Sequence, residues 1–265
     1  MIYNIDDFEH PEPNGLGVSF AYILWQMILL RDKDFRVRIT KPNNPYREAA
    51  RGGNVWDYYF DQEPALGPSE KAPLERPIDL ALSGHRDWTL ARQRAIQPFA
   101  ARHIRLRTEI QAEVDSFRRQ HFKGKVLAVH LRGTDKRQEY PAMNPGAILA
   151  TVRTLRERLG ATTIFLMTDD VEYHALLQPL GYVSQDIPRS KQSLHHNPPV
   201  SRYHSGLSVV MDGFLAASAD WFAYTPSNTA VIPLAMGRHE EIIRINQHCQ
   251  IMPFCQRVDR ALGLL

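Results

Sequence analysis

The sequence predicts an α/β protein whose parallel sheet is covered by helices on both faces. In the second half of the chain, short apolar runs alternate with longer segments of helical spacing, and this alternation is typical of a parallel sheet. Residues 126 to 131 form an apolar run of the kind found in strands buried on both faces. With 265 residues, the chain suffices for one large domain or for two small domains that share a cleft.

The first half of the chain begins with a glycine-rich turn at Gly15 and Gly17. This turn leads into a buried helix at about residues 19 to 27, in which Trp25 and Met27 are expected to belong to the core. The turn fits tight packing, and it also fits a phosphate cradle at a helix N-terminus. Further along, the sequence predicts a half-exposed strand at 36 to 40, an aromatic cluster at 54 to 60 and a helical segment from 89 to about 120.

The second half has a regular rhythm of strands and helices. Asn144 and Pro145 predict the start of a helix, and Gly160 predicts its end. One of Asp169 and Asp170 is a natural N-cap for the helix that follows them. The predicted strands are 126–131, 163–168, 182–184, 221–225 and 241–245, and the predicted helices are 145–160, 171–180, 205–219 and 228–237.

Composition excludes several classes of protein. The net charge is only +3 and acidic residues alternate with basic ones, so we expect no nucleic-acid partner. Cys249 and Cys255 are the only cysteines, which argues against a disulfide framework and favours a reducing, cytoplasmic location. The longest apolar run, residues 20 to 30, is too short to span a bilayer. We therefore expect neither a membrane span nor a signal peptide.

Polar residues follow the predicted strands at the edge where ligands bind in open parallel sheets. They lie in the segments 130–136, 168–170 and 225–228, with Glu139 beyond the first segment and Asp212 on the helix before the third. An arginine at a strand end, such as Arg132, can make two parallel charge-assisted hydrogen bonds to a diphosphate in place of a metal ion. The alternative is a surface ion pair of Arg132 with Asp135 or Asp169.

The run His130-Leu131-Arg132-Gly133-Thr134-Asp135-Lys136 resembles the H-x-R-x-T-D-K segment of the α1,6-fucosyltransferases and the rhizobial nodulation fucosyltransferases. Three further segments resemble that family in the same order. They are an apolar strand that ends in T-D-D at 165–170, a D-x-x-x-L-S-x-A-D-like helix at 209–220 and a serine-bearing turn at 225–228. Two departures are that Gly133 replaces the family's usual second arginine and that Glu139 comes one position early.

The resemblance implies a GT-B-like fold, in which two Rossmann-like domains face each other across a cleft. Residues 1–120 would form the acceptor-side domain, and residues 121–265 would bind the nucleotide sugar. The resemblance also implies an inverting, metal-independent transfer of a sugar, most simply fucose from GDP-fucose, to a glycan or other hydroxyl acceptor. No cofactor is expected besides this GDP-sugar substrate.

The resemblance further assigns roles to single residues. Arg132 would grip the β-phosphate and Asp212 would read the guanine edge. The other candidate donor-binding residues are His130, Asp170, Ser227, Asn228, Gly15 and Gly17, of which the two glycines would close over the diphosphate. An inverting transfer needs a general base, for which Glu139 is the first choice and Asp135 the second. The candidate catalytic residues are thus Arg132, Asp135, Lys136 and Glu139.

Three alternatives remain open at this point. Asp169 and Asp170 could hold a divalent metal ion through phosphate, although we favour a site without metal. The donor could be another nucleotide sugar, but a carboxylate at Asp212 suits the N1–H and N2 amino groups of guanine and suits uracil poorly. The chain could also be a nucleotide-sugar or carbohydrate-binding protein without catalytic activity, if Glu139 does not act as a base.

Overall fold

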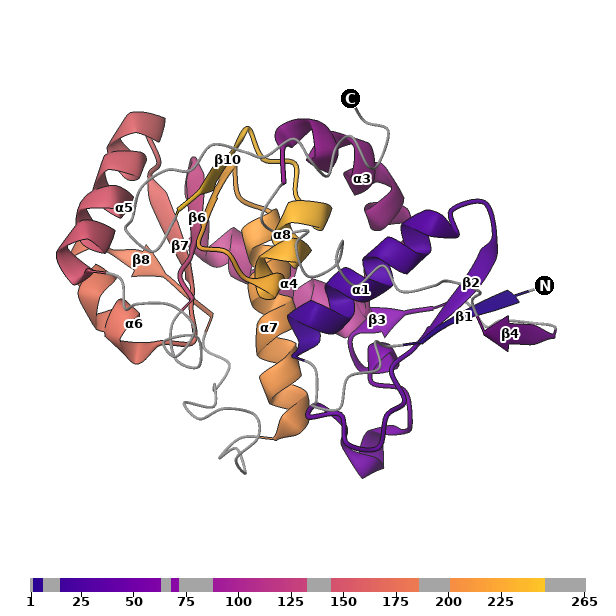
Figure 1. Ribbon diagram of the computed structural model, residues 1–265. Helices are drawn as coiled ribbons and strands as arrows, with labels where there is room; N and C mark the ends of the chain where they lie inside the picture. The colour runs from indigo at the N-terminus through magenta and orange to yellow at the C-terminus, as the bar shows by residue number, and fades with distance from the viewer. Residues whose placement is uncertain are drawn as a thin grey trace.

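The computed structural model describes residues 2–6, 15–62, 68–71, 88–132, 144–185 and 201–245. Helices and parallel strands alternate through the second half (Figure 1), so the predicted α/β class is confirmed. The main sheet contains the strands β6 (Val126–His130), β7 (Thr163–Met167), β8 (Tyr182–Val183), β9 (Trp221–Tyr224) and β10 (Glu241–Arg244).

The five strands of the main sheet are all parallel and lie in the order β10-β9-β6-β7-β8. The chain enters this sheet at its central strand β6 and continues outwards through β7 and β8. It then returns to the other side of β6 to add β9 and β10. The strand order therefore reverses between β6 and β9. Such a reversal is the topological switch point of a doubly wound sheet, where ligands bind beyond the carboxyl ends of the strands.

Helices cover both faces of this sheet. Leu127 and Val129 of β6 face a cluster that contains residues of α5 (Pro145–Leu159) and α6 (Val171–Leu177). Val126 and Ala128 belong to a second cluster, with residues of α4 (Thr108–His121), α7 (Arg202–Ala217) and α8 (Val231–Met236). Side chains of a strand alternate between faces, so the apolar character of β6 follows from burial on both sides.

The predicted helix boundaries in this half are confirmed at two helices. Asn144 is the N-cap of α5 and accepts a hydrogen bond from the Ala147 N–H, while Gly160 ends α5 in the left-handed conformation with φ of 67°. Asp170 is the N-cap of α6 and accepts from the Glu172 N–H. Helix α6 then tightens into the 3₁₀ turn η4 (Gln178–Leu180), which completes the helical segment predicted for 171–180.

The first half contains a smaller parallel sheet in the order β2-β1-β4. Its strands are β1 (Ile2–Asp6), β2 (Asp34–Arg38) and β4 (Ser69–Lys71). Helix α1 (Leu16–Leu29) connects β1 to β2, and the short 3₁₀ turns η1 (Ala49–Arg51) and η2 (Trp56–Tyr58) follow. Of these elements, only β2 and α1 were predicted from the sequence.

The helical character and the outer bounds predicted for residues 89 to 120 are confirmed, but the segment is not one continuous helix. The chain forms two helices, α3 (Leu90–His103) and α4, separated by β5 (Arg105–Leu106). Strand β5 pairs antiparallel with β3 (Phe60–Asp61), opposite the aromatic cluster of the first half. The tertiary pairing with Phe60 and Asp61 therefore overrides a helical pattern that looks continuous in the sequence.

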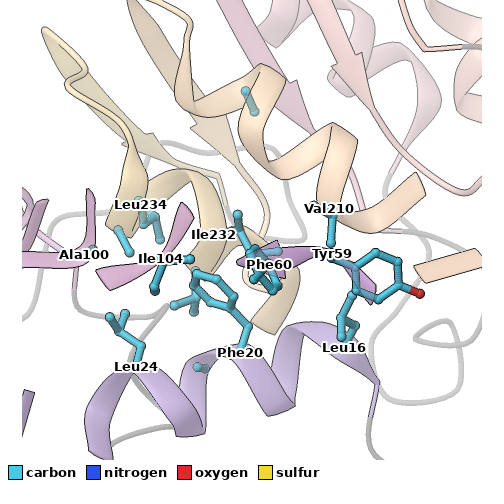
Figure 2. Packing of buried hydrophobic residues seen from close by; sticks show 14 of the residues in the cluster. Leu16, Phe20, Leu24, Tyr59, Phe60, Ala100, Ile104, Val210, Ile232 and Leu234 are labelled. Carbon is cyan, nitrogen blue, oxygen red and sulfur yellow. The ribbon is translucent and has the colours of Figure 1, made fainter. Parts of the chain in front are cut away.

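Helix α1 is apolar almost all round because it is packed on several sides. Phe20 lies against Trp56 and Phe60, with ring centroids 6.1 and 6.2 Å away. In Figure 2, Phe20 points toward Phe60 and Ile232, which come from β3 and α8. Trp25 and Met27 are buried as expected. One cluster of buried residues runs from Ile5 to Ile242 and unites both halves of the chain, while the predicted domain boundary after residue 120 remains a prediction.

Candidate functional site

The candidate site lies where β6 and β9 end, at the switch point of the main sheet. His130, the last residue of β6, pairs with Met167 of β7 on one side and with Tyr224 of β9 on the other. Its side chain is buried, and Arg132 follows two residues later. The structure thus places His130 and Arg132 beside the turn that follows β9, as the sequence predicts.

Hydrogen bonds hold the backbone of residues 130 to 132 from both neighbouring strands. On the β9 side, Thr225 donates to the His130 carbonyl from its N–H at 3.0 Å and from its hydroxyl at 3.3 Å. The Thr225 hydroxyl also accepts from the Arg132 N–H at 2.8 Å. On the β7 side, the Leu131 N–H donates to the Met167 carbonyl at 3.1 Å, and the Thr168 hydroxyl donates to the Leu131 carbonyl at 2.8 Å.

The turn after β9 supplies Ser227 and Asn228 to the same edge. Ser227 is buried, and its hydroxyl caps the 3₁₀ turn η5 (Asn228–Ala230) by accepting from the Thr229 N–H at 3.3 Å. The side-chain oxygen of Asn228 is buried and has no hydrogen-bond partner within the described part of the chain. A buried polar oxygen of this kind favours a donor group on a ligand.

The N-terminus of α1 packs directly against this turn. A Cβ atom on Gly17 would lie 2.6 Å from the Thr229 nitrogen and 2.8 Å from the Asn228 carbonyl carbon. Only glycine at position 17 permits this approach. Gly15, the N-cap of α1, has room for a Cβ atom, because its nearest neighbour would be the Tyr46 hydroxyl at 4.0 Å. The first turn of α1 therefore lies at the site edge, and Gly17 has a packing role there.

The two candidate aspartates lie on different elements. Asp170 follows the end of β7 and is buried, its carboxylate caps α6, and its N–H donates to the Thr168 hydroxyl at 3.2 Å. Asp212 is buried within α7, the helix that precedes β9. The roles of Asp170 in donor binding and of Asp212 in guanine recognition remain predictions.

Three candidate residues lie outside the described ranges. Asp135, Lys136 and Glu139 fall in the segment 133–143, for which no structure is described. The choice of Glu139 or Asp135 as general base thus remains a prediction.

A polar and aromatic cluster at the N-terminus of α7 joins the two halves of the chain. Glu48 accepts from the Tyr203 N–H at 2.9 Å and forms an ion pair with Arg51 at 3.2 Å. Burial opposes the ionisation of Glu48, but hydrogen bonds from Tyr203, Ser201 and Arg51 together lower its pKa. The Tyr59 hydroxyl donates to the Tyr203 carbonyl, and burial raises the pKa of that hydroxyl. Glu48 therefore stays charged and caps a helix end that carries positive partial charge.

Within the described ranges, no group of three or more His, Cys, Asp or Glu side chains is placed to hold a metal ion. Among the helices of those ranges, none is long and apolar enough to cross a membrane.

Thr225 and Thr168 are not among the site residues predicted from the sequence. Both threonines directly follow a strand, in the segments T-P-S-N and T-D-D. A hydroxyl residue at the carboxyl end of each strand that flanks β6 is the signal that could have identified them.

No protein-family model matches the sequence, and no curated protein is similar to it in sequence. The fold is similar to that of a NodZ α-1,6-fucosyltransferase co-crystallised with GDP, with a TM-score of 0.58 at 15% identity over 95% of this chain and 97% of that chain. Fucosyltransferase NodZ from Bradyrhizobium gives the same score and identity, over 95% and 98% of the two chains. Arabidopsis thaliana FUT1, as a mutant in complex with GDP, gives 0.54 at 11% identity over 91% and 70%. These likenesses show that the chain has the GT-B-like α/β fold of these proteins.

Proposed function

We propose that this chain is an inverting, metal-independent glycosyltransferase that transfers fucose from GDP-fucose to a hydroxyl group of a glycan or another acceptor. The observation that carries the proposal is the place of Arg132. It follows the central strand β6 at the switch point, where its N–H donates to the Thr225 hydroxyl and the Leu131 carbonyl before it accepts from the Thr168 hydroxyl. A NodZ α-1,6-fucosyltransferase of similar fold has been soaked with GDP-fucose, which supports this choice of donor.

The chemistry of the donor explains why an arginine is needed there. When the bond between the sugar and GDP breaks, negative charge develops on the leaving β-phosphate. A guanidinium offers two parallel charge-assisted hydrogen bonds to that phosphate. A donor fixed in place before the reaction stabilises developing charge without reorganising. We assign this role to Arg132.

The remaining roles are divided between residues 1–120 and residues 121–265. Residues 121–265 would bind the donor, with Asp212 on the guanine edge and with His130, Asp170, Ser227 and Asn228 near the base and the phosphates. Residues 1–120 would form the acceptor side and bring Gly15 and Gly17 to the diphosphate. Glu139, or otherwise Asp135, would take the proton of the acceptor hydroxyl. With only two cysteines in the chain, we place this activity in the reducing cytoplasm.

A ligand panel tests the proposal. The melting temperature is measured with GDP, UDP, ADP and NAD, each with and without EDTA, and GDP-fucose turnover is measured with a set of glycan acceptors. We expect GDP to stabilise most, by about 2.7 kcal/mol at 100 times its Kd, and EDTA to change nothing. Equal shifts with all nucleotides contradict the guanine assignment. Binding of GDP-fucose without transfer or slow hydrolysis favours a non-catalytic binding protein.

A further inference from the structure

We propose that Thr225 and Thr168 are positioning residues, whose hydroxyl groups fix the backbone that carries Arg132 from both sides. Thr225 does so across the switch point between β6 and β9, and Thr168 does so from β7. The proposal rests on the proposed function, because it concerns the arginine to which we assign the leaving phosphate.

The strand ladder alone cannot hold the residues that follow β6. Of the four consecutive backbone groups from the His130 carbonyl to the Arg132 N–H, backbone partners reach the first two, from Thr225 and Met167. The Leu131 carbonyl and the Arg132 N–H receive their bonds from hydroxyls, of Thr168 and Thr225, both at 2.8 Å. The two threonines therefore extend the ordered backbone past the end of the strand and up to Arg132.

The hydroxyl of Thr225 both donates and accepts a hydrogen bond. It accepts from the Arg132 N–H and donates to the His130 carbonyl, so its hydrogen has a fixed direction. The side chain is buried, and a threonine has restricted χ1 rotation because of its branched Cβ. The Arg132 backbone therefore rests on a rigid support, and its position needs little ordering when the donor binds.

The chain contains a matched control at the opposite edge of the sheet. Thr163 begins β7 and is buried to a similar degree as Thr225, with exposed fractions of 7% and 6%. Its hydroxyl donates to the Lys123 carbonyl at 2.8 Å and accepts from the Lys123 N–H at 3.2 Å. Replacement of either threonine by valine thus removes the same kinds of hydrogen bond and keeps the shape of the side chain. Only the change at Thr225 affects the support of Arg132.

The experiment compares Thr225→Val, Thr225→Ser, Thr168→Val and Thr163→Val with the wild-type chain. For each protein we measure the melting temperature, kcat and KM with GDP-fucose, the Kd of GDP, and the hydrogen exchange rate of the Arg132 amide. We expect Thr225→Val to lower kcat by about 10- to 100-fold, since a displacement of 1 Å can cost about 10²-fold in rate. Thr225→Ser keeps the hydroxyl and should recover most of this loss.

Thr168→Val should lower kcat less than Thr225→Val, because Thr168 holds the Leu131 carbonyl, one residue before Arg132. Thr163→Val should lower the melting temperature about as much as Thr225→Val and leave kcat unchanged. If Thr225→Val and Thr163→Val have equal effects on kcat, the role of Thr225 is only structural and the proposal fails.

The exchange rate separates this proposal from the proposed function. If the wild-type chain neither binds GDP nor transfers a sugar, the proposed function fails, and exchange at Arg132 alone decides the support role. If Thr225 positions Arg132, the Arg132 amide should exchange about tenfold or more faster in Thr225→Val than in Thr163→Val, because a lost hydrogen bond exposes the amide. Equal exchange rates in these two variants overturn the support role.

Discussion

Where the strands of the main sheet begin, ion pairs between charged side chains link the strand ends and add to the hydroxyl contacts of Thr163. Where β6, β7 and β9 end, the hydroxyls of Thr225 and Thr168 hold the backbone up to Arg132. At the starting edge, Lys125 forms ion pairs with Asp220, at 2.7 Å, and with Glu240. Asp220 also accepts from the Val126 N–H at 2.8 Å. The hydrogen bonds that Lys125 donates to both carboxylates raise its pKa to about 12. Here one ammonium group joins two carboxylates, Asp220 before β9 and Glu240 before β10.

The starting edge also contains the buried histidine His239, just before β10. Its ring lies over Phe222, with centroids 5.4 Å apart, and its Nδ1 lies 2.8 Å from the side-chain nitrogen of Gln93 on α3. One edge of the sheet therefore joins the strands to each other and to α3, while the other edge presents an arginine on a fixed backbone. Substitutions at the two edges should therefore change different measured quantities.

The largest contrast is expected between Arg132 and Lys125. An arginine that stabilises developing phosphate charge is worth about 10³ to 10⁵ in rate, so Arg132→Ala should abolish measurable transfer. Arg132→Lys should also lose most of the activity, because an ammonium group cannot make the bidentate contact. Lys125→Met removes a charge at the starting edge and should leave kcat unchanged. Steady-state kinetics with GDP-fucose and a melting curve for each variant measure both effects.

Normal folding, GDP affinity and turnover in Arg132→Ala would show that Arg132 is only a surface ion-pair partner. Equal losses of kcat in the Arg132 and Lys125 variants would remove the functional difference between the two edges.

The next contrast concerns the proposed general base. A general base contributes about 10² to 10⁴ in rate and little to donor affinity, so Glu139→Gln should bind GDP normally and lose transfer by about that factor. Asp135→Asn should have the smaller effect. Single-turnover kinetics together with the Kd of GDP separate the two steps. Wild-type transfer rates in Glu139→Gln would make Asp135 the leading candidate.

Much of the fold of the second half could be predicted from the sequence, because its elements carry strong local signals. Asn144 and Gly160 mark the ends of α5, and the strands β6 and β7 are apolar on both faces. The fold of the first half was harder to predict from the sequence. Strand β4 is short and exposed along its length, and it owes its conformation to the pairing with β1. Strand β5 interrupts a helical pattern only because Phe60 and Asp61 lie opposite it.

For the candidate site, the sequence could predict that Arg132, Ser227 and Asn228 lie at one edge of the sheet, while their roles stay predictions. Strand order brings the segments of Arg132, Ser227 and Asn228 together, and the resemblance of their motifs to one family indicated the same segments. The support by Thr225 depends on the pairing of β6 with β9, two strands that lie about ninety residues apart in the sequence. No local pattern specifies that pairing. The packing of Gly17 on Thr229 joins residues that lie even farther apart in the sequence.

The third prediction concerns pH and the starting edge. Burial lowers the pKa of His239 to about 4, from an ordinary value of 6.5. The hydrogen bonds agree with a neutral ring, because the Gln93 amide donates to Nδ1, and Nε2 lies 3.0 Å from the Ala216 carbonyl. Since the unfolded chain binds this proton more readily, the stability that the neutral ring contributes is complete above pH 6.5. It is lost as the pH falls toward 4, by about 3 kcal/mol.

Urea unfolding at a series of pH values between 7 and 4.5 measures this effect. His239→Gln should be less stable than the wild type at pH 7 and should show a flatter decline below pH 6.5. His121→Gln, at an exposed position of α4, serves as the control and should follow the wild-type curve. Parallel curves for the wild type and His239→Gln would show that the acid sensitivity arises elsewhere.

The smallest effect is expected for Gly17→Ala. This change alters only the packing of α1 against the turn that follows β9, at the edge where the strands end. Alanine normally stabilises a helix by about 1 kcal/mol relative to glycine, so a surface position would gain from this change. At Gly17 the new Cβ atom would instead meet the backbone of Thr229 at 2.6 Å, and overpacking of this kind costs about 1 to 3 kcal/mol. The net result should be a loss of about 1 kcal/mol, with weaker GDP binding because the turn of Ser227 and Asn228 is displaced.

Gly15→Ala is the matched control, since Gly15 has an ordinary φ of −65° and room for a Cβ atom. Calorimetry of GDP binding and melting curves should show a larger defect for Gly17→Ala than for Gly15→Ala. If Gly15→Ala weakens GDP binding as much while leaving the melting temperature unchanged, the contact proposed for both glycines with the diphosphate controls binding. The packing of Gly17 on Thr229 then does not shape the site.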